Sequence, residues 1–95
     1  MDIMMWMQDW FQKHCDGDWE HEKGITISSL DNPGWSVEIY VVNTELENKQ
    51  FTPVKIDKGQ LDWLHCKVED GFFKGYGGPK NLLQILDMFR QWTLQ

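Results

Sequence analysis

The residues best suited to chemistry lie in the stretch that begins at Cys15, where a thiol, a histidine and four carboxylates occur within eight residues. A thiol beside an imidazole, here Cys15 with His14 or His21, is the pair that a cysteine nucleophile requires. Carboxylates raise the pKa of a nearby thiol, however, and Asp16 and Asp18 stand where a sulfurtransferase loop would have cationic residues. We therefore predict no catalytic residue and no enzymatic activity, with a small cysteine-dependent enzyme using Cys15 as the alternative.

Histidines next to cysteines also raise the question of a zinc site. The zinc-type ligands of the chain are His14, Cys15, His21, His65 and Cys66. No C-x2-C or H-x3-H spacing occurs among them, and His65 and Cys66 point to opposite faces if they lie on a strand. The sequence therefore predicts no zinc site, and a buried thiol with packed or exposed histidines is the simpler interpretation.

The acids of the same stretch imitate the start of an EF-hand calcium loop, Asp16-x-Asp18-x-Glu20. His21 stands where that loop needs glycine, and Ile27 stands where it needs a bidentate glutamate. We therefore predict a solvated acidic loop, without a metal or another cofactor.

The composition predicts one folded domain over residues 1–95, because a chain of this length suffices for a single core. Six Trp, five Phe and two Tyr supply the large apolar side chains that so short a chain needs. The net charge of −6 is uneven, since residues 1–48 hold ten acids against Lys13 and Lys23. An acidic surface repels nucleic acid and anionic lipid, and it favours a basic protein partner.

Neither a secretory leader nor a membrane-spanning run is evident, since no apolar stretch approaches about 18 residues. Cys15 and Cys66 are the two cysteines of the chain. We therefore expect a cytoplasmic protein with reduced thiols that binds neither nucleic acid nor a membrane.

The elements that must position these residues are two terminal helices and about five strands. Apolar residues recur at helical spacing over residues 2–14 and again after Pro79, where proline suits a first helical turn. Alternation predicts the strands, which are residues 25–29, 35–42, 51–56, 61–69 and 72–76. Asp31-Asn32-Pro33-Gly34 and Asp70-Gly71 are hairpin turns. We predict an α+β fold, an antiparallel β-meander of about five strands with the N- and C-terminal helices packed on it.

The tryptophans fall into two groups by their positions in these elements. Trp10, Trp63 and Trp92 lie on the predicted core faces, so we expect them to be buried. Trp6 and Trp19 are less easily buried, and we expect them to be exposed and available to a partner.

Two runs of residues, Cys15-Asp16-Gly17-Asp18-Trp19-Glu20-His21 and Leu30-Asp31-Asn32-Pro33-Gly34-Trp35, resemble the immunity protein 53 family of bacterial polymorphic toxin systems. The likeness continues at Gly75-Tyr76-Gly77-Gly78-Pro79 and so covers nearly the whole chain. It implies a small cytoplasmic protein that is encoded beside a toxin and protects the producing cell by binding the toxin's effector domain. It implies neither enzymatic activity nor a cofactor.

The residues themselves indicate where such a toxin would bind. The predicted toxin-binding residues are Asp16, Asp18, Trp19, Glu20, Glu22 and Asp31. The acids would steer a basic effector domain, such as a nuclease, while Trp19 would serve as an apolar anchor among them. An acidic adaptor for another basic protein is the second alternative. We expect a monomer or, through the surplus apolar residues Met4, Met5 and Trp6, a weak homodimer.

Overall fold

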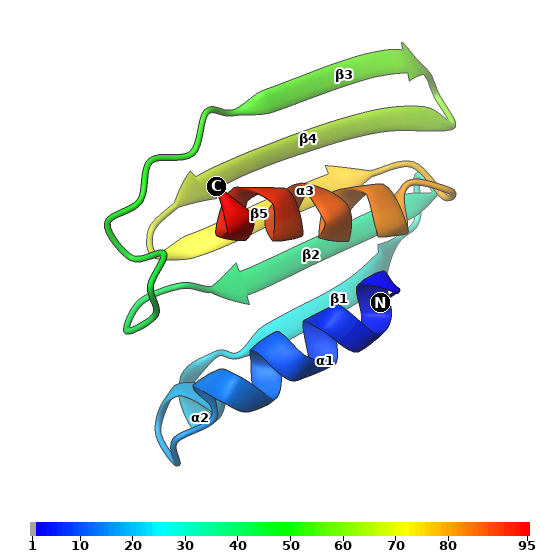
Figure 1. Ribbon diagram of the computed structural model, residues 1–95. Coiled ribbons are helices and arrows are strands. Elements are labelled where there is room, and N and C mark those ends of the chain that lie inside the picture. The colour runs from blue at the N-terminus through cyan, green and yellow to red at the C-terminus, as the bar shows by residue number, and fades with distance from the viewer. Residues whose placement is uncertain (1) are drawn as a thin grey trace.

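The computed structural model describes residues 2–95, which form one five-stranded antiparallel sheet with helices against one face (Figure 1). The helices are α1 (Ile3–His14), the single turn α2 (Trp19–Glu22) and α3 (Leu82–Leu94). The strands are β1 (Ile25–Leu30), β2 (Gly34–Tyr40), β3 (Val54–Gly59), β4 (Asp62–Glu69) and β5 (Phe72–Gly77). The predicted α+β fold, with five antiparallel strands and a helix at each end, is confirmed.

The strands lie in the order β1-β2-β5-β4-β3, so β5 occupies the centre of the sheet. β3, β4 and β5 form a meander, and β5 also pairs with β2, where Val37 lies opposite Gly75. Residues 43–53 therefore cross from β2 to the far edge of the sheet, where β3 begins directly after Pro53. An edge position suits Pro53, because proline has no N–H to donate to a neighbouring strand. β1 forms the other edge.

The register places one set of apolar side chains on the face of the sheet that the helices cover. The fully buried members of this set are Val37, Ile39, Leu64, Cys66 and Phe73. They pack against Met7 and Trp10 of α1 and against Ile85, Leu86, Phe89 and Trp92 of α3. The predictions that Trp10 and Trp92 belong to the core are confirmed.

A glycine lets α3 approach the centre of the sheet. A Cβ atom added to Gly75 would overlap the Cγ2 atom of Ile85 on α3. Phe73, two residues earlier on β5, fills the core with a ring that lies edge-on to Phe89 and Phe51. The last strand in the sequence, β5, therefore lies directly beneath the last helix, α3 (Figure 1).

The opposite face of the sheet, which we call the open face, is not covered by any helix of the described residues (Figure 1). Leu64 and Cys66 point toward the helices, so the alternate residues Trp63 and His65 lie on the open face. The prediction that Trp63 is a core residue is therefore wrong. Both faces of β4 carry apolar side chains, so alternation alone did not decide which face is buried.

Hydrogen bonds fix both long helices at their ends. Asp2 begins α1, because its Oδ1 atom accepts a hydrogen bond from the N–H of Met5 at 2.9 Å. Lys49 caps the end of α3, where its Nζ atom donates to the carbonyl oxygens of Trp92 and Gln95, each at 2.8 Å. In residues 2–95, no helix has the length and apolar composition needed to cross a membrane.

Candidate functional site

Residues 15–23, which we call the acidic loop, are held by their own carboxylates. The Oδ1 atom of Asp16 accepts hydrogen bonds from the N–H groups of Asp18 at 2.9 Å and Trp19 at 3.0 Å. The carboxylate of Glu20 accepts from the N–H groups of Asp16 at 3.0 Å and Gly17 at 2.8 Å. Gly17 has a φ of +96°, a conformation that glycine adopts without strain. The carboxylates therefore hold the conformation of the loop in addition to giving it negative charge.

The same hydrogen bonds favour the ionised carboxylates. The N–H groups of Trp19 and Asp18 lower the pKa of Asp16. The pKa of Glu20 is also lowered, chiefly by its own backbone N–H and further by those of Asp16 and Gly17, against some desolvation. Both groups are negatively charged at neutral pH and accessible to a partner.

Protonation of these carboxylates at acidic pH should therefore lower the free energy of unfolding. A carboxylate whose pKa is lowered by folding stabilises the fold above its unfolded pKa and loses that contribution as the pH falls through the folded value. For Asp16 the unfolded value is 3.8. Asp16→Asn keeps an acceptor oxygen but has no charge to titrate, so the variant should lose less stability than the wild type between about pH 5 and pH 2. Urea unfolding across that range measures this, and an equal loss in both proteins would contradict it.

Trp19 is buried beneath the acidic loop, with only 2% of its surface exposed. Its indole N–H donates to the carbonyl oxygen of Tyr40 at 3.2 Å, and its ring lies edge-on to Trp10 with centroids 5.6 Å apart. The prediction that Trp19 is exposed is therefore wrong. The turn α2, which the sequence analysis did not predict, points Asp18 outward and the indole inward.

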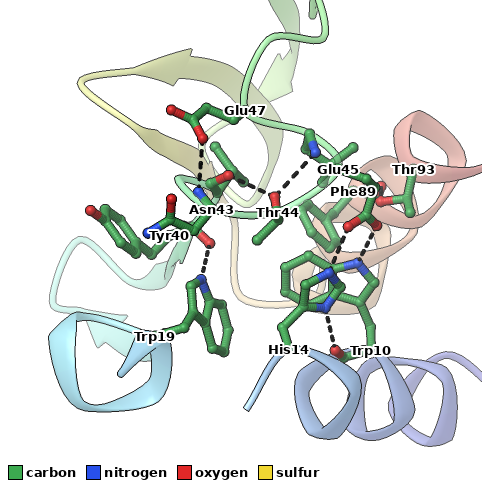
Figure 2. A network of polar contacts seen from close by, with 12 residues as sticks. Trp10, His14, Trp19, Tyr40, Asn43, Thr44, Glu45, Glu47, Phe89 and Thr93 are labelled. Carbon is green, nitrogen blue, oxygen red and sulfur yellow. Dashed lines mark hydrogen bonds and ion pairs between the residues drawn. The ribbon is translucent and has the colours of Figure 1, made fainter. Parts of the chain in front are cut away.

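Three segments that are distant in sequence meet at the end of the sheet beside α2. The acidic loop is tied to β2 by Tyr40, whose carbonyl oxygen accepts from the indole N–H of Trp19 at 3.2 Å. The N–H of Tyr40 donates to the carbonyl of Gly24, the residue after the loop, at 2.9 Å. The turn between β4 and β5 lies next to it, because the N–H of Val41 donates to the carbonyl of Gly71 at 2.9 Å. Residues 43–50 follow β2 after Val41 and Val42, and they lie beside both α1 and the acidic loop (Figure 2).

A side-chain network links residues 43–50 to α1 (Figure 2). Glu45 accepts a hydrogen bond from the indole N–H of Trp10 at 3.0 Å, and its second oxygen lies 2.6 Å from Nε2 of His14. The Nδ1 atom of His14 donates to the carbonyl oxygen of Trp10 at 2.8 Å. Partial burial would raise the pKa of Glu45, but hydrogen bonds from its own N–H, Trp10 and His14 lower it overall. This carboxylate is therefore also held in place and charged.

Together these segments make a surface that we call the acidic end. Its acids are Asp16, Asp18, Glu20, Glu22, Glu45, Glu47 and Asp70, all of them exposed or partly exposed. The lysines of the same segments are Lys23 and Lys49, and Lys49 is turned toward the last carbonyls of α3. Four of these acids are neighbours in sequence and were predicted as part of the site. Glu45, Glu47 and Asp70 were not predicted, because only the strand order brings their segments together.

Asp31 does not belong to the acidic end. It lies in the turn between β1 and β2, and the whole of β1 separates it from the acidic loop (Figure 1). Six residues of strand span roughly 20 Å. The hairpin therefore carries Asp31 to the opposite end of the sheet from Asp16–Glu22. Contact of Asp31 with the toxin stays a prediction.

The thiols are poorly suited to nucleophilic chemistry. Cys15 Sγ lies 3.2 Å from the carbonyl oxygen of Phe11, and desolvation followed by the charges of Glu20 and Asp16 raises its pKa. Burial raises the pKa of Cys66 to about 12. Within the described residues, no three His, Cys, Asp or Glu side chains are grouped so that they could hold a metal ion. The acidic end presents fixed charge, and it presents no activated nucleophile.

The open face of the sheet has a shallow hollow of its own, remote from the acidic end. It has a volume of about 650 Å³ and lies between the turn at Asn32 and the hairpin of β3 and β4. Trp63 and His65 line it, together with Asp57. The Nε2 atom of His65 is buried without a hydrogen-bond partner in the structure. These side chains can contact a protein surface, but they do not form a catalytic or metal-binding arrangement.

Comparison with protein families adds direct evidence on function. The model of the family Immunity protein 53 matches residues 4–93 of the chain. The chain belongs to this family. Searches of curated proteins and of solved structures gave no match. Membership of the Immunity protein 53 family gives the chain an immunity-protein role, with a protein, its cognate toxin, as the partner.

Proposed function

We propose that this immunity protein neutralises a toxin effector domain by stoichiometric binding through its acidic end. The observation that carries the proposal is the fixed placement of charge there. Asp16, Glu20 and Glu45 are each held by hydrogen bonds and kept ionised by a lowered pKa. Exposed Asp18 and Glu22 flank two of them.

Fixed charge suits an inhibitor for two physical reasons. An acidic surface steers a basic partner toward it and raises the association rate constant, up to about 10⁸–10⁹ M⁻¹s⁻¹ at low salt. Side chains that are already ordered lose less conformational entropy on binding, which otherwise costs about 0.5–1.5 kcal/mol per side chain. The expected partner is therefore an effector domain with a basic face, as an enzyme that acts on nucleic acid would have.

Burial of Trp19 changes how the complex must be held together. This side chain cannot insert into a pocket of the toxin while it is packed against Trp10. Slow dissociation must instead come from ion pairs that lose their water on binding, between these carboxylates and arginine or lysine side chains of the toxin. Coupling energies of close charge pairs at protein interfaces reach about 1.5–7 kcal/mol.

The experiment that tests the proposal is a titration of the effector domain encoded beside this chain's gene. We expect activity to fall linearly to zero at one immunity protein per toxin, with Cys15→Ala equal to the wild type, because the thiol has no part in binding. Calorimetry of the same mixture should give the same stoichiometry. Protection by much less than one equivalent, or loss of protection in a folded Cys15→Ala variant, would show catalysis and contradict the proposal.

A further inference from the structure

The edge strand β1 has a set of backbone groups that pair with nothing inside the sheet. Neighbouring antiparallel strands exchange hydrogen bonds at alternate residue pairs. The N–H of Tyr40 donates to the carbonyl of Gly24, so the bonded pairs that follow are Thr26 with Glu38 and Ser28 with Ser36. The N–H and C=O groups of Ile25, Ile27 and Ser29 therefore point away from β2, toward the free edge.

The two edges of the sheet differ in how they are protected. β3 follows Pro53, carries Lys55, Asp57 and Lys58, and has a register irregularity near its end. These are the features by which proteins prevent edge-to-edge association. β1 has the sequence Ile-Thr-Ile-Ser-Ser-Leu, with no charge, no proline and no irregularity in its register. Its residues 26–29 are exposed, and 40% of the surface of Ile27 is accessible.

We propose that β1 pairs with β1 of a second copy of this chain, antiparallel and centred on Ile27, to form a dimer with a continuous sheet. In this register Ile27 lies opposite Ile27 of the partner copy and Ile25 lies opposite Ser29, so all the outward backbone groups are used, in about six hydrogen bonds. No side chain of the strand places a charge at the interface. The strand is therefore complementary to itself.

Charges at the ends of the strand support the same register. β1 runs from Ile25 to Leu30, so Lys23 lies just beyond one end of the strand and Asp31 just beyond the other. In the antiparallel pair these two ends meet, which brings Lys23 of one copy near Asp31 of the other. Lys23 and Asp31 are both exposed, and neither has an ion-pair partner among residues 2–95. The dimer therefore places a lysine beside an aspartate at both ends of the paired strands. This complementarity selects a second copy of the chain over an unrelated strand.

An apolar groove next to β1 adds to the interface. It has a volume of about 180 Å³, no polar surface, and walls formed by Met4, Phe11, Ile25 and Ile27 among others. Pairing places the Ile27 side chain of the second copy at its mouth, next to exposed Met4 and Phe11. The paired strands and the apolar groove beside them bury less surface than a stable interface needs. We therefore expect a micromolar dissociation constant.

The dimer is compatible with toxin binding at the acidic end. The two Lys23 positions would be roughly 25 Å apart along the paired strands. This separation exceeds the Debye length of about 8 Å at physiological salt, so the two acidic ends repel each other weakly. Dimerisation and toxin binding therefore use different surfaces, and the inference does not depend on the proposed function.

Sedimentation velocity of the full chain, from about 1 µM to 1 mM, tests the proposal. We expect a concentration-dependent shift from monomer to dimer in the wild type. Ile27→Lys places two like charges at the centre of the interface and should weaken the dimer by about 100-fold or more. Ile56→Lys on the protected edge is the matched control and should leave the dimer intact. Thermal unfolding of each variant confirms that it is folded.

A charge exchange tests the register independently. Lys23→Asp alone places two acids together and Asp31→Lys alone places two lysines together, so each should weaken the dimer. The double variant restores opposite charges and should recover the wild-type dissociation constant. A chain that stays monomeric up to about 1 mM, a dimer that Ile27→Lys leaves unchanged, or a double variant no better than the single ones would overturn the proposal. Loss of toxin binding by Ile27→Lys in a monomeric chain would also overturn it, by assigning the edge to the toxin.

Discussion

Replacement of Trp19 by alanine should lower the free energy of unfolding by about 3–5 kcal/mol. The side chain is 2% exposed, lies against Trp10 and Phe11, and donates a hydrogen bond to the carbonyl of Tyr40. Alanine would leave a cavity between α1 and the end of β2, together with an unpaired carbonyl. Domains of this size have total stabilities of about 5–15 kcal/mol, so the variant should be close to unfolding. Urea denaturation followed by fluorescence measures the loss.

Trp6→Ala is the matched control for this prediction. Trp6 is only partly buried and lies edge-on to Phe89 with ring centroids 6.2 Å apart. Its replacement should cost about 1–2 kcal/mol, because less apolar surface is returned to water. Similar losses for the two variants would show that Trp19 contributes no more to the core than a residue at its margin, contrary to the structure.

Reversal of charge at Asp18 and Glu22 should lower the rate constant for association with the toxin by about tenfold or more at low salt. Both side chains are exposed, and unlike Asp16 and Glu20 they accept no hydrogen bonds from the loop backbone. Asp18→Lys with Glu22→Lys therefore changes the field of the acidic end without removing the bonds that shape it. Stopped-flow fluorescence measures the rate, and the difference from the wild type should shrink as salt screens the charges.

The control for this prediction is Glu38→Lys with Asp57→Lys on the open face. Each reversal adds two charges, so both double variants change the net charge from −6 to −2. The control should therefore lower the association rate constant much less, because its charges lie away from the acidic end. Equal effects of the two double variants would mean that only net charge matters, and the acidic end would lose its special role.

The fold could largely be predicted from local patterns in the sequence. The apolar spacing of residues 2–14 predicted α1, and Asp70-Gly71 predicted a tight hairpin, in which both residues indeed have a positive φ. The order of the strands in the sheet was harder to predict, because nothing in residues 43–53 indicates which strand β2 will pair with. The pairing of β2 with β5 depends on a long-range fit, with Gly75 placed under α3.

The candidate site was only partly predictable, for a related reason. Asp16, Asp18, Glu20 and Glu22 are neighbours in sequence, so their clustering could be seen directly. The orientation of Trp19 depends on the single turn α2, which is too short to give a periodic signal. Glu45 joins the site only because His14 and Trp10 hold it there from another element. Asp31 was grouped with the acidic loop because it is close to the loop in sequence, but the whole length of β1 separates them in space.

Amide hydrogen exchange of the chain, alone and in complex with its toxin domain, tests most directly whether the acidic end is the binding surface. We expect slower exchange on binding in residues 15–23, 43–50 and 70–71, and unchanged exchange in the turn between β3 and β4. Slower exchange confined to β4 and β5, or to the turn around Asp31, with the three segments of the acidic end unchanged, would contradict the proposed function.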